Sequence, residues 1–243
     1  MRKLIAALSL ALCAPAGATP SGQILIPSTD IQPYKVLHLN FDSFIRTQDE
    51  NDGRRLGPMV LVGPTIGVLP WEKVRAEAGF DLLYKGVQSL DNNPLYFHGK
   101  VATPERSLED WSPALALGVF NVGTKDGLTN QDMVYGLAAR TLPAVGRLSF
   151  GWYGGNGAAL RDEQNRVANH GVLASWDRTM EELSKKLWCS VDYQGGQNVM
   201  GAASLGCSWA LSEKTSVILG YDVWNNRAVA GKNTVNLQVD INF

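Results

Sequence analysis

The chain has 243 residues, a formal net charge of −1, 45% hydrophobic residues and 19% charged residues. Three cysteines are too few for a disulfide scaffold, and this hydrophobicity excludes general disorder. The near-neutral charge argues against a nucleic-acid-binding protein, whose surface normally has a basic face.

The first eighteen residues have the three parts of a secretory signal peptide. Met1-Arg2-Lys3 is a positive start, Leu4 to Leu12 is apolar, and Ala16-Gly17-Ala18 is a small-residue cleavage motif. The apolar run is too short to cross a bilayer as a helix. We therefore expect residues 1–18 to be removed on export.

Residues 19–33 follow as a proline-rich segment, with Pro20, Pro27 and Pro33. Prolines at this spacing favour an extended chain over a regular element. We expect an extended periplasmic lead-in here, ahead of a folded domain at 34–243.

Residues 34–243 repeat one pattern, in which apolar and polar side chains alternate. In the last run, Val235 to Phe243, every odd position is apolar and every even position is polar. A period of two indicates strands with one dry face and one wet face. Twelve strands are predicted, at 34–46, 57–69, 72–84, 94–103, 112–122, 132–142, 146–154, 168–176, 185–195, 199–211, 214–224 and 233–243.

The lengths of these strands and of their connections favour a membrane barrel. Most have the roughly 9–11 residues that a tilted transmembrane strand needs, whereas soluble strands average about 5–6. Short connections alternate with longer polar ones, as in outer-membrane barrels. We predict an all-β, transmembrane antiparallel up-and-down β-barrel of twelve strands, with both termini periplasmic. A secreted β-sandwich is the alternative, since its strands also alternate.

Aromatic residues near the strand ends support the barrel. Their positions in the alternation predict that eight of them face outward. They form two girdles around an aliphatic band, which is the interfacial pattern of a membrane barrel. They are Trp111, Trp176, Trp209 and Phe243 at one end, and Tyr84, Tyr135, Trp152 and Tyr193 towards the other.

The signal peptide, the twelve alternating strands and the terminal Val239-Asp240-Ile241-Asn242-Phe243 together resemble a bacterial outer-membrane β-barrel protein of the porin-like kind. The resemblance implies a location in the bacterial outer membrane, in contact with its lipid. It also implies that Val239, Ile241 and Phe243 form the assembly signal read by the barrel-assembly machinery. It carries no particular substrate.

The inward side chains decide what such a barrel does. The alternation of inward and outward positions predicts pore-lining residues with charges of both signs. They are His38, Asp42, Lys73, Arg75, Glu77, Asp81, His98, Lys100, Arg140, Arg147, Asp192, Asp222 and Asp240, and the uncharged Asn40 lies among them. A strongly selective pore would be expected to show one dominant sign. The mixture favours a narrow, weakly selective diffusion channel for small polar solutes.

Small inward residues favour an open lumen, because they leave space. They are Gly79, Gly136, Ala138, Gly151, Ser190, Ser204, Gly206 and Gly220. The alternative is a lumen closed by ion pairs, in a barrel with a structural or binding role. Residues 19–33 either cross the lumen as a plug or hang free, and their composition does not distinguish the two.

An outer-membrane lipid hydrolase is a further alternative. The chain has three histidines, His38, His98 and His170, and neither His38 nor His98 has an obvious serine nucleophile beside it in sequence. Nucleophilic catalysis needs a nucleophile and a base within hydrogen-bonding reach. We therefore predict no enzyme activity, no cofactor and no metal site.

The remaining cysteines lead to a specific hypothesis. Cys13 leaves with the signal peptide, so Cys189 and Cys207 stay in an oxidising compartment. They lie on consecutive predicted strands with the same outward parity, and a hairpin centred on Asn198 places them opposite each other. We predict a cross-strand disulfide, against the alternative of two lipid-facing thiols.

Overall fold

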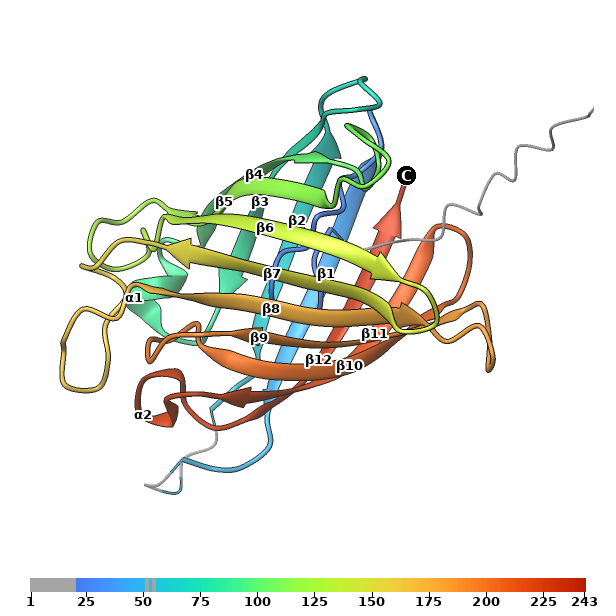
Figure 1. The fold of residues 1–243 in the computed structure, drawn as a ribbon. Coiled ribbons are helices and arrows are strands. Elements are labelled where there is room, and N and C mark those ends of the chain that lie inside the picture. Colours follow the sequence, from blue (N-terminus) through green and yellow to red (C-terminus); the bar gives the residue numbers. More distant parts are fainter. Residues whose placement is uncertain (1–20, 51–52, 54–55) are drawn as a thin grey trace, which may run out of the picture.

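The computed structural model describes residues 21–50, 53 and 56–243, so the predicted signal peptide lies outside the described residues. In the described part, twelve antiparallel strands form a closed barrel (Figure 1). They are β1 (Leu37–Arg46), β2 (Met59–Gly67), β3 (Arg75–Tyr84), β4 (Leu95–Thr103), β5 (Ala114–Gly123), β6 (Met133–Leu142), β7 (Gly146–Gly154), β8 (His170–Thr179), β9 (Leu187–Gln194), β10 (Ala202–Ala210), β11 (Thr215–Trp224) and β12 (Thr234–Asn242).

Pairing of the first strand with the last closes the sheet. In β1 and β12, Leu39 is opposite Ile241 and Asn40 is opposite Asp240. Closure leaves no unpaired strand edge in the sheet. The prediction of twelve strands and an up-and-down barrel is confirmed, and the β-sandwich alternative is wrong.

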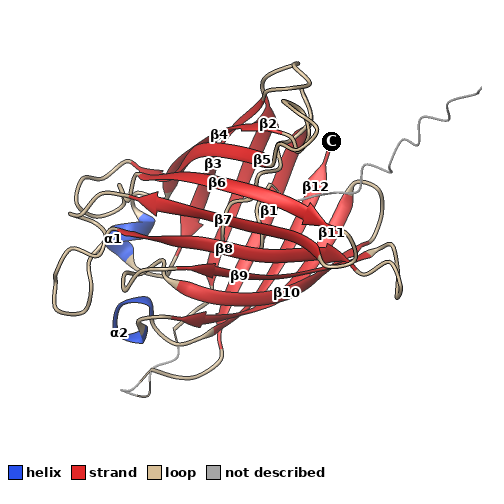
Figure 2. Cartoon of the chain, viewed as in Figure 1, coloured by secondary structure: helices blue, strands red, loops and turns tan. Residues whose placement is uncertain are grey.

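Two one-turn helices, α1 (Gln88–Asp91) and α2 (Arg227–Ala230), lie in loops beside the barrel (Figure 2). The alternating pattern did not predict them. Within residues 21–50, 53 and 56–243, no helix combines the length and the apolar character needed to cross a membrane.

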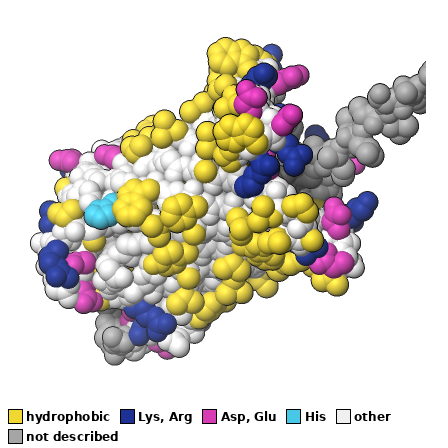
Figure 3. Space-filling model, in the orientation of Figure 1, with side chains coloured by type: hydrophobic (Ala, Val, Ile, Leu, Met, Phe, Trp, Pro, Cys, Tyr) yellow, Lys and Arg dark blue, Asp and Glu magenta, His cyan; other side chains and the backbone are white. Residues whose placement is uncertain are grey.

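The exterior of the barrel carries a band of large apolar side chains. On the face shown in Figure 3, hydrophobic side chains lie in patches over the strands, and charged ones gather towards the two ends. Outward residues that are well exposed include Phe41, Ile45, Leu117, Leu148, Phe150, Leu205, Leu219 and Leu237. Polar and charged residues are buried inside instead. This inverted arrangement suits a barrel surrounded by lipid.

The two ends of the barrel differ. Both ends of the described chain lie at one of them, where the Phe243 backbone N–H donates to the Leu37 carbonyl at 2.9 Å. This end also carries the connections β2–β3, β4–β5, β6–β7, β8–β9 and β10–β11, and we call it the short-turn end. The opposite end carries the other six connections, and we call it the long-loop end. That the short-turn end faces the periplasm remains a prediction.

Strand β6 corrects the predicted faces. Tyr135 is 3% exposed and belongs to an interior cluster, so its expected place in the outward girdle is wrong. Gly136 and Ala138 accordingly face outward rather than into the lumen. This strand has no charge before Arg140 to mark its wet face, and its larger side chains fill an apolar sector of the interior. That sector contains Ile26, Met133, Tyr135, Leu137, Tyr153, Leu160 and Leu173.

The predicted disulfide is present. Cys189 and Cys207 are direct cross-strand partners on β9 and β10, and a disulfide joins them with their Cα atoms 4.0 Å apart. Their loop is centred on Asn198, as the spacing of the two residues predicted.

Candidate functional site: the barrel lumen

The lumen contains part of the chain itself. Residues 21–28 form a narrow hairpin, in which Gly22 bridges Pro27 and the Gln23 N–H donates to the Ile26 carbonyl at 2.7 Å. We call residues 21–28 the N-terminal hairpin. Ile24 is 3% exposed and Ile26 is 1% exposed, because both lie inside the barrel. The sequence left two possibilities for this segment, a plug in the lumen or a free chain. The structure shows it in the lumen.

The tip of the hairpin is bound by strand β9. One carboxylate oxygen of Asp192, Oδ2, accepts the backbone N–H groups of Ile24 and Leu25 at 2.6 and 3.0 Å. The Gln238 side-chain amide on β12 donates to the Ile24 carbonyl at 2.7 Å. These bonds satisfy backbone groups of the tip that are shielded from water.

Next to the tip, Gln23 joins two further strands. Its amide nitrogen donates to Asp177 on β8 at 2.9 Å, and its amide oxygen accepts from the Ser190 hydroxyl on β9 at 2.9 Å. The two ends of one side-chain amide therefore fix the hairpin against the wall.

A buried ion pair holds the other side of the segment. Lys100 on β4 lies 3.3 Å from Glu77 on β3, and its ammonium donates to the carbonyls of Ser21 and Ser28 at 2.6 and 3.1 Å. Glu77 in turn accepts the backbone N–H of Gln32 at 2.7 Å. Both charges are therefore paired with each other and hydrogen-bonded to the segment, as buried ions need to be.

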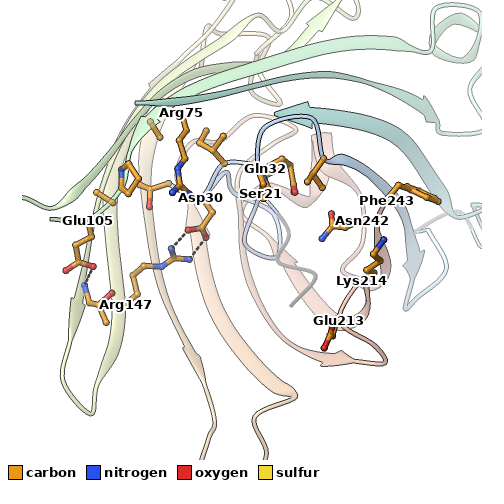
Figure 4. Close-up of a pocket in the computed structure, with 18 residues that line it drawn as sticks. Ser21, Asp30, Gln32, Arg75, Glu105, Arg147, Glu213, Lys214, Asn242 and Phe243 are labelled. Carbon is orange, nitrogen blue, oxygen red and sulfur yellow. Dashed lines mark hydrogen bonds and ion pairs between the residues drawn. The ribbon is translucent and has the colours of Figure 1, made fainter. Parts of the chain in front are cut away.

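A second ion pair lies nearer the short-turn end. The Arg147 guanidinium on β7 binds both carboxylate oxygens of Asp30, at 2.7 and 2.8 Å, and its Nε donates to Asp177 at 2.9 Å. Figure 4 shows Asp30 facing Arg147 across the interior. Burial alone would raise the pKa of Asp30, but its pairing with Arg147 outweighs this and holds the pKa below the ordinary 3.8.

A cavity of about 500 Å³ opens beside this pair at the short-turn end (Figure 4). Residues 29–33 form one wall, and Arg75, Glu105 and Lys214 contribute charged side chains from the barrel. Small solutes can therefore reach the segment from this side.

The part of the wall formed by β1 to β4 is less covered. Asn40, Asp42, Asp81 and His98 face the lumen there and remain partly exposed, whereas the inward residues of β9 to β12 are mostly buried. This difference leaves a strip of partly exposed polar residues on the β1 to β4 side of the lumen, and we call these four residues the acidic strip.

A chain of hydrogen bonds lies within and beside this strip. The Nδ1 atom of His98 is 3.0 Å from Asp81, and its Nε2 atom is 2.8 Å from the Thr65 hydroxyl. Gly79 makes room for it, because a Cβ at that position would lie 2.3 Å from Nε2. Threonine, histidine and aspartate in this order match a nucleophile, a base and an orienting acid. Thr65 is only 3% exposed, which closes its hydroxyl to a substrate in this structure.

Most of the predicted pore-lining residues do face the interior. His38, Glu77, Lys100, Asp192, Asp222 and Asp240 are buried there, and Asp42, Asp81, His98 and Arg147 are partly buried. Arg75 is exposed at the cavity. His38 Nε2 lies 3.3 Å from a carboxylate oxygen of Asp240.

Two predicted pore-lining residues are placed wrongly. Lys73 lies in the exposed turn before β3, because that strand begins at Arg75. Arg140 lies on the outward face of β6, where it pairs with Glu105 at 3.2 Å and donates to the Trp111 carbonyl. The first error comes from beginning the strand too early. The second comes from taking the one charge on β6 as a mark of the wet face.

Other inward residues were missed. Asp177 falls one residue beyond the predicted end of its strand, which continues to Thr179. Arg46 is the last residue of β1 and faces inward. It lies an even number of positions from Asp42, so the alternation could have predicted its face. Thr65 carries no charge and had no signal of its own.

These changes alter the balance of charge in the lumen. Among the described strand residues that face it, the fixed positive charges are Arg46, Arg75, Lys100 and Arg147, and the carboxylates are Asp42, Glu77, Asp81, Asp177, Asp192, Asp222 and Asp240. Glu77 and Asp177 are ion-paired. The strand residues that face the lumen therefore include more carboxyl groups than fixed positive charges.

The residues expected to act as an assembly signal end the chain on the outside of the barrel. Val239 and Ile241 are partly exposed on β12, and Phe243 is well exposed beyond it. Their role in assembly remains a prediction.

No protein-family model matches this chain, and no curated protein matches its sequence. Solved structures do match. The KdgM porin has a TM-score of 0.53 at 7% identity, over 85% of this chain and 99% of that one. A structure from work on the in-meso crystallization of membrane proteins has a TM-score of 0.52 at 12% identity, over 86% and 83%.

The COG4313 outer membrane channel from Pseudomonas putida F1 is more distant, with a TM-score of 0.48 at 8% identity over 89% and 98% of the two chains. At these identities the two matches with TM-scores above 0.5 establish the fold alone. Together with the apolar exterior and the closed sheet of twelve strands, they show that the chain folds as a porin-like outer-membrane β-barrel.

Proposed function

We propose that this protein is an outer-membrane diffusion channel for small polar solutes, that its N-terminal hairpin narrows the lumen, and that the remaining passage favours cations. The porin-like fold supports a channel in general. The observation that carries the preference for cations is the acidic strip, which combines Asp42 and Asp81 with partial exposure to the lumen.

The path follows the strip because the other side of the lumen is filled. The hairpin covers the inward face of β9 to β12, and its contacts with Asp192, Gln238 and Ser190 fix it there. A solute that passes must move along β1 to β4, between the strip and the hairpin. A ring or row of one charge sign is the usual origin of ion selectivity in such pores.

Single-channel recording in planar bilayers under a salt gradient tests this function. We expect small discrete steps and a reversal potential that favours cations. The double variant Asp42→Asn/Asp81→Asn should shift the reversal potential towards zero. Glu182→Gln, a surface carboxylate in the β8–β9 turn, is the control and should change nothing. An unchanged potential in the double variant would contradict the assigned path.

A closed barrel with a structural or binding role is the second candidate, and the extent of the hairpin's buried contacts favours it. The two candidates differ in the behaviour of the wild-type protein. If the folded wild type is silent while a deletion of residues 21–33 conducts, the barrel is closed at rest. If both are silent, the channel function is wrong.

A further inference from the structure

Strands β9 and β12 hold the tip of the N-terminal hairpin by its backbone. Asp192 accepts the N–H groups of Ile24 and Leu25 at 2.6 and 3.0 Å. The Gln238 amide donates to the Ile24 carbonyl at 2.7 Å. These bonds do not depend on the side chains at the tip, because every residue except proline carries the same N–H and C=O groups.

The base of the hairpin is held in the same way. The Lys100 ammonium donates to the carbonyls of Ser21 and Ser28 at 2.6 and 3.1 Å. Just beyond the hairpin, Glu77 accepts the backbone N–H of Gln32 at 2.7 Å. The two charges of the buried Glu77–Lys100 pair therefore bind backbone groups of the segment as well as each other.

The hairpin itself carries no charge, although charged side chains of the wall contact it. Residues 21–28 are Ser-Gly-Gln-Ile-Leu-Ile-Pro-Ser. The Gln23 side chain presents a further amide, which donates to Asp177 and accepts from the Ser190 hydroxyl. Buried charges need hydrogen-bonding partners, and amide groups supply them here. The wall therefore recognises the amide groups of a peptide.

Two aliphatic side chains complete the fit. Ile26 is fully buried in the apolar sector of the interior. Ile24 is also buried, and its Cδ1 atom lies 3.0 Å from the position that a Cβ on Gly206 would take. It packs where that residue of β10 has no side chain. The wall therefore selects aliphatic side chains at two positions of the turn, in addition to its backbone.

We propose that this wall is a binding site for a short, uncharged peptide turn with two aliphatic side chains, and that the N-terminal hairpin occupies the site as an internal ligand. A separate peptide of this kind can form the same bonds. The site opens towards the short-turn end, where the cavity of about 500 Å³ borders Ser21 and residues 29–33 (Figure 4). This inference does not depend on conduction.

The covalent link decides which peptide occupies the site. Residues 29–36 join the hairpin directly to β1. A ligand on a short tether competes at an effective concentration on the order of millimolar. A separate peptide should therefore bind once this link is cut, and the intact chain should exclude it.

A full chain with a cleavable link tests the site. A sequence-specific protease site between Tyr34 and Lys35, which are both exposed, lets the barrel fold with its hairpin before the cut. The probe is a fluorescent synthetic peptide of residues 21–33, and its anisotropy in detergent measures binding. We expect the cut barrel to bind the probe and the uncut barrel to exclude it.

Each fate of the cut segment is informative. If it stays on the barrel through gel filtration, it is bound as a separate peptide, as the proposal requires, and excess probe should displace it. If it leaves, the empty barrel should take up the probe. A folded barrel that loses its segment and does not bind the probe would overturn the proposal.

Modified probes test what the wall recognises. N-methylation at Ile24 and Leu25 removes the two donors to Asp192 and keeps both side chains, so it should weaken binding roughly a hundredfold. The change Ile26→Asp should abolish binding, because it places a charge in the apolar sector. A probe of scrambled sequence is the control and should not bind. Equal binding of the N-methylated and unmodified probes would refute backbone recognition.

Variants of the wall locate the site. Asp192→Asn keeps an acceptor oxygen but removes the charge, so the cut barrel should bind the probe roughly tenfold more weakly. Asp240→Asn is the matched control, because Asp240 is buried on β12 with His38 and Ser216 as its partners. It should bind the probe with unchanged affinity. Unchanged affinity in Asp192→Asn would place the peptide elsewhere and refute this site.

Discussion

Asp30 and Arg147 are 117 positions apart in sequence, yet they form a two-pronged ion pair that joins the N-terminal segment to the barrel wall. Arg147 also binds Asp177, so one guanidinium holds two carboxylates in one plane. Such bidentate pairs are geometrically specific as well as strong. The pair therefore fixes where the segment lies, and it offers a direct way to release it.

Replacing Arg147 by alanine should release residues 29–33 from the wall. The change leaves Asp30 and Asp177 without their cation, and breaking this partly buried pair costs about 1–2 kcal/mol. That shifts the balance between bound and released segment by roughly tenfold. Single-channel recording should show larger or more frequent openings than in the wild type.

Arg178→Ala is the control for this variant. Arg178 is on the next strand but faces outward and pairs with Glu182 on the surface. Its removal should leave conductance unchanged. If Arg147→Ala conducts like the wild type, the ion pair does not hold the segment in the lumen.

Acid should release the same contact. Because pairing with Arg147 lowers the pKa of Asp30, the bound state is favoured above the ordinary pKa of 3.8, and this advantage is lost as the pH falls through the lower, bound value. Conductance should stay constant from neutral pH to about pH 5 and rise in stronger acid. The charges facing Asp30 are Arg147 and, farther away, Lys100.

The variant Asp30→Asn identifies the group responsible for this acid response. It should conduct at neutral pH as the wild type does in acid, and its own change with pH should be smaller. A full acid response in Asp30→Asn would assign the titration to other carboxylates.

The disulfide should stabilise the barrel without affecting passage through it. Cys189 and Cys207 are 18 positions apart and lie on the outward face, remote from the acidic strip. Closing a loop of this size contributes about 3 kcal/mol. The double variant Cys189→Ser/Cys207→Ser should therefore unfold at lower urea, with the reversal potential of the wild type. Free thiols in denatured, unreduced protein would contradict the disulfide.

Gly79→Ala should disturb the hydrogen-bonded histidine. A Cβ there would lie 2.3 Å from His98 Nε2 and 2.4 Å from the Pro64 carbonyl, so the ring and the strand must both move. Overpacking of this kind costs about 1–3 kcal/mol. Gly136→Ala is the matched control, since nothing lies within 4 Å of a Cβ at that strand position. Urea unfolding of the two variants should separate them, and equal stability would contradict the close approach of His98.

The sequence by itself determined the architecture. Alternation with a period of two, strand length and connection length are local properties, and they predicted twelve strands and a closed barrel. The pairing of Cys189 with Cys207 was also predictable, because hairpin register depends only on the position of its turn. Faces were predictable where charges lie on the wet side, as at Glu77 and Asp192. The prediction failed for Tyr135 and Arg140 because the one charge on β6, Arg140, faces outward and pairs with Glu105.

Only the tertiary structure decided what fills the lumen. Prolines in residues 19–33 indicated an extended chain, but the partners of that chain are more than forty residues away, on β3, β4, β7, β8, β9 and β12. A backbone N–H that donates to a distant carboxylate leaves no local pattern. The hairpin and the acidic strip beside it arise because barrel closure brings these side chains together around one short segment.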